Sequence, residues 1–314
     1  MIQPMQTAKV IVAGSTTIDL IFLGKIFSQR KTADRLSLAY GGKYIVDEFY
    51  QFCGGGGANV SVSLSRQGIP TWLWSKVSQD NFGKIIYENL KREKVNLEFV
   101  ERMLKNDPIS AILLDYQGLR TIINYRAEAD KLTFSDALGK QLKDFSWLAL
   151  FSLPLWPKEE KIKVLKFAKE NKVGIFLSLH ADEYRRGLAY AAEYFKYSDI
   201  LDLNVYELST LLGKKPAALN LRRENFAKVL NIPMVLVTCD INGSYFYSAD
   251  QSFHQPPIDV KRVDTTGAGD AFSAGFLGKF IKTGDVKKSM EFATRNAVSE
   301  IEVLGAQTGL LYDK

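Results

Sequence analysis

A regular alternation between short β-branched or aromatic runs and longer helical patterns is the strongest constraint on how this chain folds. Such alternation is typical of a mainly parallel sheet with helices on both faces. Gly68, Gly213 and Gly284 follow three of the helical patterns, and glycine readily adopts the left-handed conformation that ends a helix. The predicted strands are residues 10–13, 71–77, 147–153, 173–179, 200–203 and 234–238, and the predicted helices are residues 58–67, 81–94, 158–171, 205–212, 222–230 and 271–282.

Two segments interrupt this rhythm, and both have the pattern of antiparallel ribbons. They cover residues 21–52 and 109–126. The second has Gln117 and Gly118 between two apolar runs, and a glycine there suits the positive φ of a tight hairpin. We expect the two segments to form one small sheet outside the main domain. Because ligands of such folds bind beyond the carboxyl ends of parallel strands, this sheet could cover the site as a lid.

The composition excludes several classes of protein. The 314 residues are 46% hydrophobic, which is enough for the core of a large α/β domain. The net charge is +6, but basic and acidic residues are interleaved, so we expect solvated helix faces and no nucleic-acid partner. We find no apolar stretch long enough for a membrane span and no secretory signal, and Cys53 and Cys239 fit a reducing compartment. A cytoplasmic protein without membrane contact is therefore expected.

The nine residues from 264 to 272, Asp-Thr-Thr-Gly-Ala-Gly-Asp-Ala-Phe, carry the clearest chemical signal. Gly267 and Gly269 allow the backbone to come close to a ligand, and the first amides of the following helix point at any anion that lies there. Asp270 lies beside this predicted anion site. A carboxylate next to a phosphate repels it, which suits a base that takes a proton from an attacking hydroxyl during phosphoryl transfer.

Two further motifs combine polar side chains with a strand end or a glycine run. Asp19 follows the first predicted strand and could accept hydrogen bonds from substrate hydroxyls, although taken alone it is more simply a surface turn residue. The four glycines at 54–57 lead directly into the helix that holds Asn59. A flexible linker would not normally run into a periodic helix, so the run favours close approach to a ligand. Asn59 could offer both a donor and an acceptor to a sugar.

Asn204 and Glu207 open the helix that follows the strand at 200–203. Oxygen ligands of this kind suit Mg²⁺, directly or through its waters. An asparagine followed three residues later by a glutamate is also an ordinary capping box at the start of a helix. The residues alone leave both interpretations open.

In this order and at these spacings, the four motifs resemble those of the ribokinase-like carbohydrate kinases, also called the phosphofructokinase B family. The resemblance extends over nearly the whole chain, and its most specific parts are residues 54–83 and 263–275. It implies a single kinase domain over residues 1–314, with a ribokinase-like αβα sandwich, a mainly parallel central sheet and a small β-sheet lid. It also implies ATP-dependent phosphorylation of a hydroxymethyl group on a small sugar of the fructose, ribose or ketoacid type.

The resemblance assigns roles to individual residues. Asp270 matches the catalytic base of the family, and the amides around Gly267, Ala268 and Gly269 match its anion hole. The remaining matches are substrate contacts at Asp19, Gly55, Gly56 and Asn59, nucleotide contacts at Asn204, Thr238, Gly243 and Asn296, Mg²⁺ held by Glu207 through water, and in many members K⁺ held at Asp264, Thr266 and Gly305.

This sequence departs from the family pattern at several positions. Gly56 replaces a lysine of ribokinases proper, which weakens an assignment to ribose. Asp240 replaces the first glycine of the nucleotide motif, where a carboxylate could repel a phosphate. Tyr125 and Arg126 resemble a pair that ketoacid-sugar kinases use on substrate, and Arg126 could grip a carboxylate or phosphate, although an exposed lid arginine without a ligand is an equal interpretation. His180 lies near the site by position and receives no chemical role.

The predicted function is a sugar kinase with Asp270 as base, and two alternatives remain. A nucleoside kinase of the same family is the first, because nucleosides present a similar 5′-hydroxymethyl group. A catalytically silent sugar sensor is the second: Asp240 favours it, and the intact Asp270 counts against it. Neither a P-loop nor a dinucleotide-binding glycine motif is present. Since an apolar lid edge would be a ready dimer surface, we expect a homodimer through the lid sheet.

Overall fold

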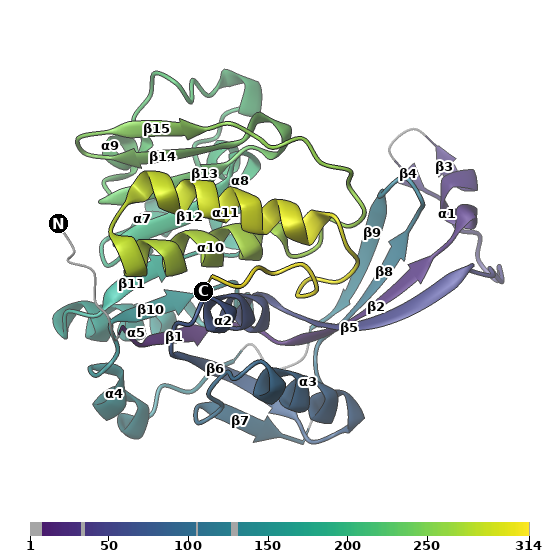
Figure 1. The fold of residues 1–314 in the computed structure, drawn as a ribbon, viewed down its shortest axis with the longest axis horizontal. Coiled ribbons are helices and arrows are strands. Elements are labelled where there is room, and N and C mark those ends of the chain that lie inside the picture. Colours follow the sequence, from purple (N-terminus) through teal and green to yellow (C-terminus); the bar gives the residue numbers. More distant parts are fainter. Residues whose placement is uncertain (1–7, 33–34, 105, 127–130, 314) are drawn as a thin grey trace.

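Two β-sheets of unequal size form the framework of the chain (Figure 1). The structure is a computed structural model that describes residues 8–32, 35–104, 106–126 and 131–313. In the view of Figure 1 the larger sheet and most of the helices fill the left and centre, and the smaller sheet projects to the right. The prediction of a large, mainly parallel sheet accompanied by a smaller one is confirmed.

The larger sheet is parallel over most of its width. Within the described residues it has nine strands in the order β15-β14-β13-β12-β11-β10-β1-β6-β7, and β14 pairs antiparallel with both of its neighbours. All four residues of β1 are buried, because helices cover both faces of the centre. The antiparallel edge was not predicted. The strands are β1 (Val10–Ala13), β6 (Thr71–Ser78), β7 (Val100–Met103), β10 (Trp147–Leu150), β11 (Gly174–Leu177), β12 (Ile200–Asn204), β13 (Met234–Thr238), β14 (Ser244–Ser248) and β15 (Ser252–Gln255).

Helices pack on both faces of this sheet, as predicted. Successive residues of a strand point to opposite faces, so Val10 and Val12 pack with Phe276 of α10, whereas Ile11 belongs to the core on the other face. Figure 1 shows α10 and α11 side by side in front of the sheet. None of the described helices combines the length and apolar character that crossing a membrane requires. The helices are α1 (Lys25–Gln29), α2 (Gly56–Arg66), α3 (Asn81–Arg92), α4 (Asp136–Leu142), α5 (Lys158–Glu170), α6 (Ala181–Arg185), α7 (Leu188–Phe195), α8 (Val205–Leu211), α9 (Phe226–Leu230), α10 (Ala268–Thr283) and α11 (Val286–Ile301).

The smaller sheet joins the two segments that interrupt the alternation. In the part of the chain that the structure describes, its order is β5-β2-β8-β9; β2 pairs antiparallel with β5 but in parallel with β8. The hairpin between β8 and β9 is longer than predicted, because Asp115 and Leu119 close it with a 3.0 Å backbone hydrogen bond, and Gly118 lies within it at φ +78°. The strands are β2 (Thr17–Leu23), β5 (Glu48–Gly54), β8 (Ile109–Leu114) and β9 (Arg120–Tyr125), with a separate pair of β3 (Lys31–Thr32) and β4 (Arg35–Leu36).

Several element boundaries differ from the predictions. Helix α10 begins at Ala268 rather than residue 271, because Gly267 caps it in the left-handed conformation at φ +84°. Asp19 lies inside β2 and not at the carboxyl end of β1, since the chain leaves β1 at Ala13 and forms a second strand from Thr17. Helix α11 was not predicted, because its buried side includes polar residues and shows no continuous apolar stripe.

Candidate active site

A cavity of about 330 Å³ lies beyond the carboxyl ends of four parallel strands. Ser152, Ser178, Asn204 and Thr238 follow or end β10, β11, β12 and β13, and all four line it. The other side is formed by the first turn of α10, which contributes Asp270. This is the edge at which α/β sheets bind ligands. The remaining lining residues are Leu179, His180, Ala181, Asp202, Leu203, Glu207, Gly269 and Ser273.

One carboxylate oxygen of Asp270 is hydrogen-bonded within the protein, and the other faces the backbone of a glycine. Asp270 Oδ2 accepts a 2.8 Å hydrogen bond from Asn59 Nδ2. A β-carbon built on Gly56 would lie 3.4 Å from its Oδ1, so the glycine leaves that oxygen accessible. Removal from bulk water raises the pKa of Asp270 to about 6, Asn59 opposes this shift, and the charge of Asp19 adds to it.

The backbone around Asp270 has the form of an anion site. Gly267 has φ +84°, and a β-carbon there would come within 2.6 Å of the Ala306 β-carbon, so the turn requires glycine. Nothing lies within 4 Å of a β-carbon built on Gly269, so this side of the helix start is open. The first amides of α10 therefore stand at an accessible helix N-terminus, where the amide of Ala268 makes a long 3.4 Å hydrogen bond to the Thr265 carbonyl oxygen.

Asp19 approaches the same region from the smaller sheet. It is 4% exposed, accepts a 3.1 Å hydrogen bond from Thr17 Oγ1, and leaves no room for a side chain at Gly54. Burial raises its pKa, while hydrogen bonds from Ser110 and Thr17 and the charge of Arg126 lower it. Burial lowers the pKa of His180 in the cavity wall, and the charge of Arg126, which follows β9, lowers it further. The predicted lid arginine is thus electrostatically coupled to both sheets.

The glycines at 54–57 allow close packing between backbone segments, and one of them also faces Asp270. Gly55 has φ +95°, and a β-carbon there would lie 2.6 Å from the carbonyl oxygen of Ser15. Gly57 is packed equally closely on Gly14. Of the two predicted substrate glycines, Gly56 therefore faces Asp270, whereas Gly55 is required by the crossing of two backbone segments.

Both ends of the Asn59 amide form hydrogen bonds within the protein, which the sequence did not predict. Its Nδ2 donates to Asp270, and its Oδ1 accepts a 3.0 Å hydrogen bond from Gln307 Nε2. The side chain is 3% exposed. One lone pair of the acceptor that we expected to face a sugar is therefore used within the protein, and the other lone pair and the second Nδ2 hydrogen remain.

Asn204 and Glu207 form the capping box that the sequence left open, and they also line the cavity. Asn204 Oδ1 accepts from the backbone of Glu207 over 2.9 Å, and Glu207 Oε2 accepts from the backbone of Asn204 over 2.8 Å. Burial raises the pKa of Glu207. No set of three or more acidic, histidine or cysteine side chains converges as direct metal ligands within the described residues. The oxygens present fit a Mg²⁺ ion held through water rather than by a closed protein cage.

The predicted nucleotide residues do not all reach the cavity. Thr238 lines it. Gly243 has φ +78°, and a β-carbon there would lie 2.2 Å from the Gln255 carbonyl oxygen. Asp240 lies in the left-handed region at φ +50°, where the family glycine would fit without strain, and its carboxylate forms a 3.0 Å ion pair with Arg262.

Asn296 does not fit the predicted contact with a nucleotide. The residue is fully buried, and its Nδ2 donates to Ala271 O over 2.7 Å and to Ser63 Oγ over 3.0 Å. Its Oδ1 accepts from the backbone of Leu311 over 2.8 Å. Asn296 therefore ties α11 to α2, α10 and the C-terminal segment, with its amide used inside the core.

The three residues predicted to hold K⁺ converge on one carboxylate. Asp264 Oδ1 accepts from the backbone and the hydroxyl of Thr266, over 2.9 and 2.7 Å, and its Oδ2 faces the backbone N–H of Gly305 at 3.4 Å. Asp264 is 1% exposed. The loop before α10 is thus organised around a buried carboxyl group, whose oxygens suit a monovalent cation.

Sequence reasoning missed two groups near Asp270. Asp202 lines the cavity, accepts a hydrogen bond from Ser273, and burial raises its pKa to about 7. Its Oδ1 has no hydrogen-bond partner in the described part of the chain. The sequence could have indicated Asp202. Residues two apart in a strand share a face, and Asp202 lies two residues before Asn204. Gln307 had no comparable signal.

Residues 7–312 match the pfkB family carbohydrate kinase model. The bifunctional ribokinase/ribose-5-phosphate isomerase A of Fructilactobacillus sanfranciscensis is 28% identical over 308 residues, which cover 96% of this chain but 54% of that protein. The Arabidopsis thaliana ribokinase complexed with ribose and ATP has a TM-score of 0.80 at 23% identity, with 98% of this chain and 96% of that chain covered. The nucleoside kinase of Methanocaldococcus jannaschii has a TM-score of 0.76 at 21% identity, with 97% and 95% covered. The two solved structures share the fold of this chain.

Proposed function

As the chain belongs to the pfkB family of carbohydrate kinases, we propose that it transfers the γ-phosphoryl group of ATP to a hydroxymethyl group of a small sugar, with Asp270 as the base. Family membership confirms the resemblance of the motifs, and with it a carbohydrate or nucleoside kinase of ribokinase-like fold. The finer proposal is carried by Asp270, which lies at a helix N-terminus in the cavity, with a pKa of about 6 and one oxygen left accessible by Gly56.

Groups of this protein can accept the proton of the acceptor hydroxyl and stabilise the negative charge on the transferred phosphoryl group. The acceptor hydroxyl approaches over Gly56 and gives its proton to Asp270 Oδ1. Its oxygen forms a bond to the γ-phosphorus while the bond from that phosphorus to the bridging oxygen breaks, and ADP leaves. A base with a pKa of about 6 is mostly ionised at neutral pH and still accepts a proton. The amides of Gly267, Ala268 and Gly269 stabilise negative charge on the transferred group.

The acceptor site lies between the two sheets in this proposal. Asp19 accepts hydrogen bonds from the other hydroxyls of the substrate, and the free Nδ2 hydrogen of Asn59 donates to it. Gly55 and Gly56 let the substrate come close to the backbone. Arg126, which acts electrostatically on both Asp19 and the cavity wall, binds an anionic or strongly polar group of the acceptor.

The ATP phosphates lie along the carboxyl ends of β12 and β13, beside Asn204 and Thr238, with the Gly243 turn beyond. Mg²⁺, when bound, would neutralise phosphate charge, and Glu207 would hold it through water. A monovalent cation at Asp264, Thr266 and Gly305 would balance the buried carboxylate just before the anion site.

We assign the role of lid to the smaller sheet, over segments of about 21–52 and 109–126. Arg120 at the start of β9 donates to the hydroxyl of Thr265, so this sheet already contacts the loop before α10. The edge strand β9 exposes Ile122, Ile123 and Tyr125, an apolar edge that suits a homodimer through the lid sheet. We place the reaction in the cytoplasm, whose reducing conditions suit the free Cys53 and Cys239.

A nucleoside is the second candidate acceptor, because the solved nucleoside kinase shares this fold and a nucleoside presents the same kind of hydroxymethyl group. The test is ADP release with ATP, Mg²⁺ and K⁺ against ribose, ketoses, 2-keto-3-deoxygluconate and nucleosides, with Asp270→Asn as control. Turnover of one sugar class that disappears in the variant supports the proposal. Turnover of nucleosides alone would select the second candidate, and binding without any turnover would indicate a sensor.

A further inference from the structure

Asn59 decides how Asp270 is held, and an amide side chain can be held in two ways. In one orientation its NH₂ group faces the carboxylate, and in the other its carbonyl oxygen does. The structure has Asn59 Nδ2 donating to Asp270 Oδ2 over 2.8 Å. Because the two ends of an amide are nearly the same size, the orientation is set by the hydrogen-bond partners at both ends, the Asp270 carboxyl at one and a second group at the other.

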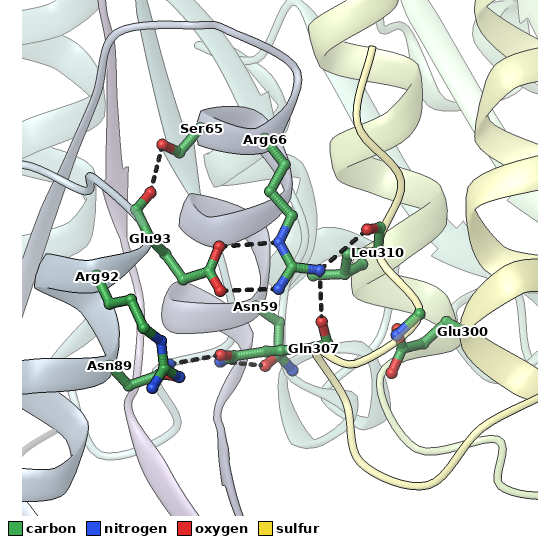
Figure 2. A network of polar contacts seen from close by, with 10 residues as sticks. Asn59, Ser65, Arg66, Asn89, Arg92, Glu93, Glu300, Gln307 and Leu310 are labelled. Carbon is green, nitrogen blue, oxygen red and sulfur yellow. Dashed lines mark hydrogen bonds and ion pairs between the residues drawn. The ribbon is translucent and has the colours of Figure 1, made fainter.

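A chain of hydrogen bonds provides that partner (Figure 2). Gln307 Nε2 donates to Asn59 Oδ1 over 3.0 Å, and Asn89 Nδ2 donates to Gln307 Oε1 over 2.8 Å. Arg92 Nη2 donates to Asn89 Oδ1 over 2.6 Å. Each amide accepts at its oxygen and donates from its nitrogen, so all three point from Arg92 towards Asp270.

Arg92 gives this chain its direction. A guanidinium group has five donors and no acceptor, so Asn89 must present its oxygen to Arg92 and its NH₂ group to Gln307. The same reasoning passes along the chain to Asn59. We propose that Arg92, Asn89 and Gln307 are positioning residues, which fix the Asn59 amide in the orientation that donates to Asp270. This inference rests on the proposed role of Asp270 as the base.

The middle of the chain is braced by an ion pair. Arg66 donates to the backbone carbonyl oxygens of Gln307 and Leu310 over 2.8 and 3.0 Å, and Glu93 grips Arg66 through two hydrogen bonds of 2.9 and 2.8 Å. Figure 2 shows Arg66 between Glu93 and the C-terminal segment, beside the row of amides. The backbone of Gln307 is therefore held in place, and its side chain has little freedom to move away from Asn59 and Asn89.

The direction of the chain matters because it acts on the proton affinity of Asp270. A donor next to a carboxylate favours its ionised form, whereas a carbonyl oxygen in the same place favours the protonated form. The other ionisable groups that act on Asp270 or respond to it are Asp19, Asp202 and Glu300, and the variants below leave all three in place. Reversal of the three amides would therefore raise the pKa of Asp270 above its value of about 6. Turnover would then fall on the acid side, where the base is already partly protonated.

Arg92→Glu tests the direction from the surface, since Arg92 is exposed at the end of α3. A glutamate accepts, so Asn89 is expected to turn its NH₂ group outwards and the whole chain to reverse. The acid limb, which is the fall of turnover at low pH, is expected to shift to a pH about one unit higher. Turnover at pH 5.5 would then be about tenfold lower than in the parent, with little change at pH 8.5. Arg92→Lys can only donate and should retain the parent's limb. Lys91→Glu makes the same charge change at the adjacent exposed residue and should not move it.

Gln307→Glu tests the centre, because a glutamate can accept from Asn89 but cannot donate to Asn59. It should move the limb in the same direction, with thermal unfolding checking that the variant is folded. The titration of Asp270, followed by ¹³C NMR of its carboxyl carbon and assigned with Asp270→Asn, should shift in parallel in both variants. An unchanged titration in folded Arg92→Glu and Gln307→Glu would overturn the inference. This titration needs no turnover. If the parent protein showed no kinase activity, the proposed function would be refuted, and the titration would still test the row of hydrogen bonds from Arg92 to Asp270.

Discussion

Two neighbouring parts of the cavity differ in how completely the protein satisfies their polar groups: the base end, at Asp270 on α10, and the donor end, at Asp202 on β12. At the base end, Asp270 and Asn59 are held through hydrogen bonds that continue to Gln307. At the donor end, Asp202 Oδ1 has no hydrogen-bond partner within the described residues, and burial raises the pKa of Asp202 to about 7. We interpret the base end as organised in advance and the donor end as adapted to a cation and phosphates. The predictions below contrast these two ends.

The largest effect is expected from removing the base itself. Asp270→Asn keeps the size of the side chain but cannot take a proton, so turnover should fall by about 10³-fold or more with acceptor binding largely retained. Asp19→Asn removes the carboxylate that is proposed to bind the acceptor and should act mainly on the KM of the acceptor. Steady-state kinetics of both variants separate the two effects; a similar loss of turnover in both would remove the distinction between base and substrate contact.

The glycine run offers a matched pair for the base end. Gly56→Ala places a methyl group 3.4 Å from Asp270 Oδ1 and should lower turnover by about 100-fold in a folded protein. Gly55→Ala forces alanine to φ +95° and into the Ser15 carbonyl, and should lower the free energy of unfolding by about 3 kcal/mol. Kinetics and denaturant unfolding of both variants are the measurements. If Gly56→Ala kept full turnover, the acceptor would not approach over Gly56.

The donor end should respond through pH and cations. The folded pKa of Asp202, about 7, lies above the ordinary value of 3.8, so between these values the folded protein keeps a proton that the unfolded chain has released. The parent's free energy of unfolding therefore falls as pH rises to about 7 and is then level with respect to this group. Asp202→Asn avoids that loss and should gain about 4 kcal/mol relative to the parent at pH 8, with little gain at pH 4.

Mg²⁺ should reduce this difference at pH 8, since it favours the ionised carboxylate of the parent. Denaturant unfolding at both pH values, with and without Mg²⁺, checks the prediction. A gain that is the same at pH 4 and pH 8 would mean that Asp202 is not a proton-binding group of the folded state.

The smallest effect is expected at Asp240. Its carboxylate is paired with Arg262 and does not line the cavity, so Asp240→Gly should change the KM for ATP by about twofold or less. The variant should gain about 1 kcal/mol in stability, because glycine adopts the left-handed conformation at φ +50° without strain. A tenfold lower KM for ATP would instead show that Asp240 repels the donor and would revive the sensor hypothesis.

The sequence predicted the features that depend on local backbone geometry. Glycines around Asp270 favoured a helix start, because glycine readily adopts the positive φ of Gly267 and has no β-carbon to meet Ala306. Alternating strands and helices likewise predicted the sheet and therefore the edge at which the cavity lies. Asn204 and Glu207 were recognised on the same local grounds.

The features that depend on distant packing could not be predicted. Gln307 meets Asn59 across 248 residues, and nothing in its own neighbourhood indicates this partner. Asn296 was assigned to a nucleotide because a sequence does not reveal that a polar side chain is buried among core partners. Helix α11 was missed because its buried Asn296 and Glu300 break the apolar period on which helix prediction depends.

The central claim is that Asp270 accepts the proton of the acceptor hydroxyl, and the pH dependence of turnover tests it most directly. Asp270 must be ionised to act, so turnover should fall as pH drops through about 6. The same limb should persist in Asp202→Asn, which removes the neighbouring carboxyl of similar pKa. Turnover that stays level between pH 5 and pH 7.5 would contradict the account, and a limb that disappears in Asp202→Asn would transfer the role of base from Asp270 to Asp202.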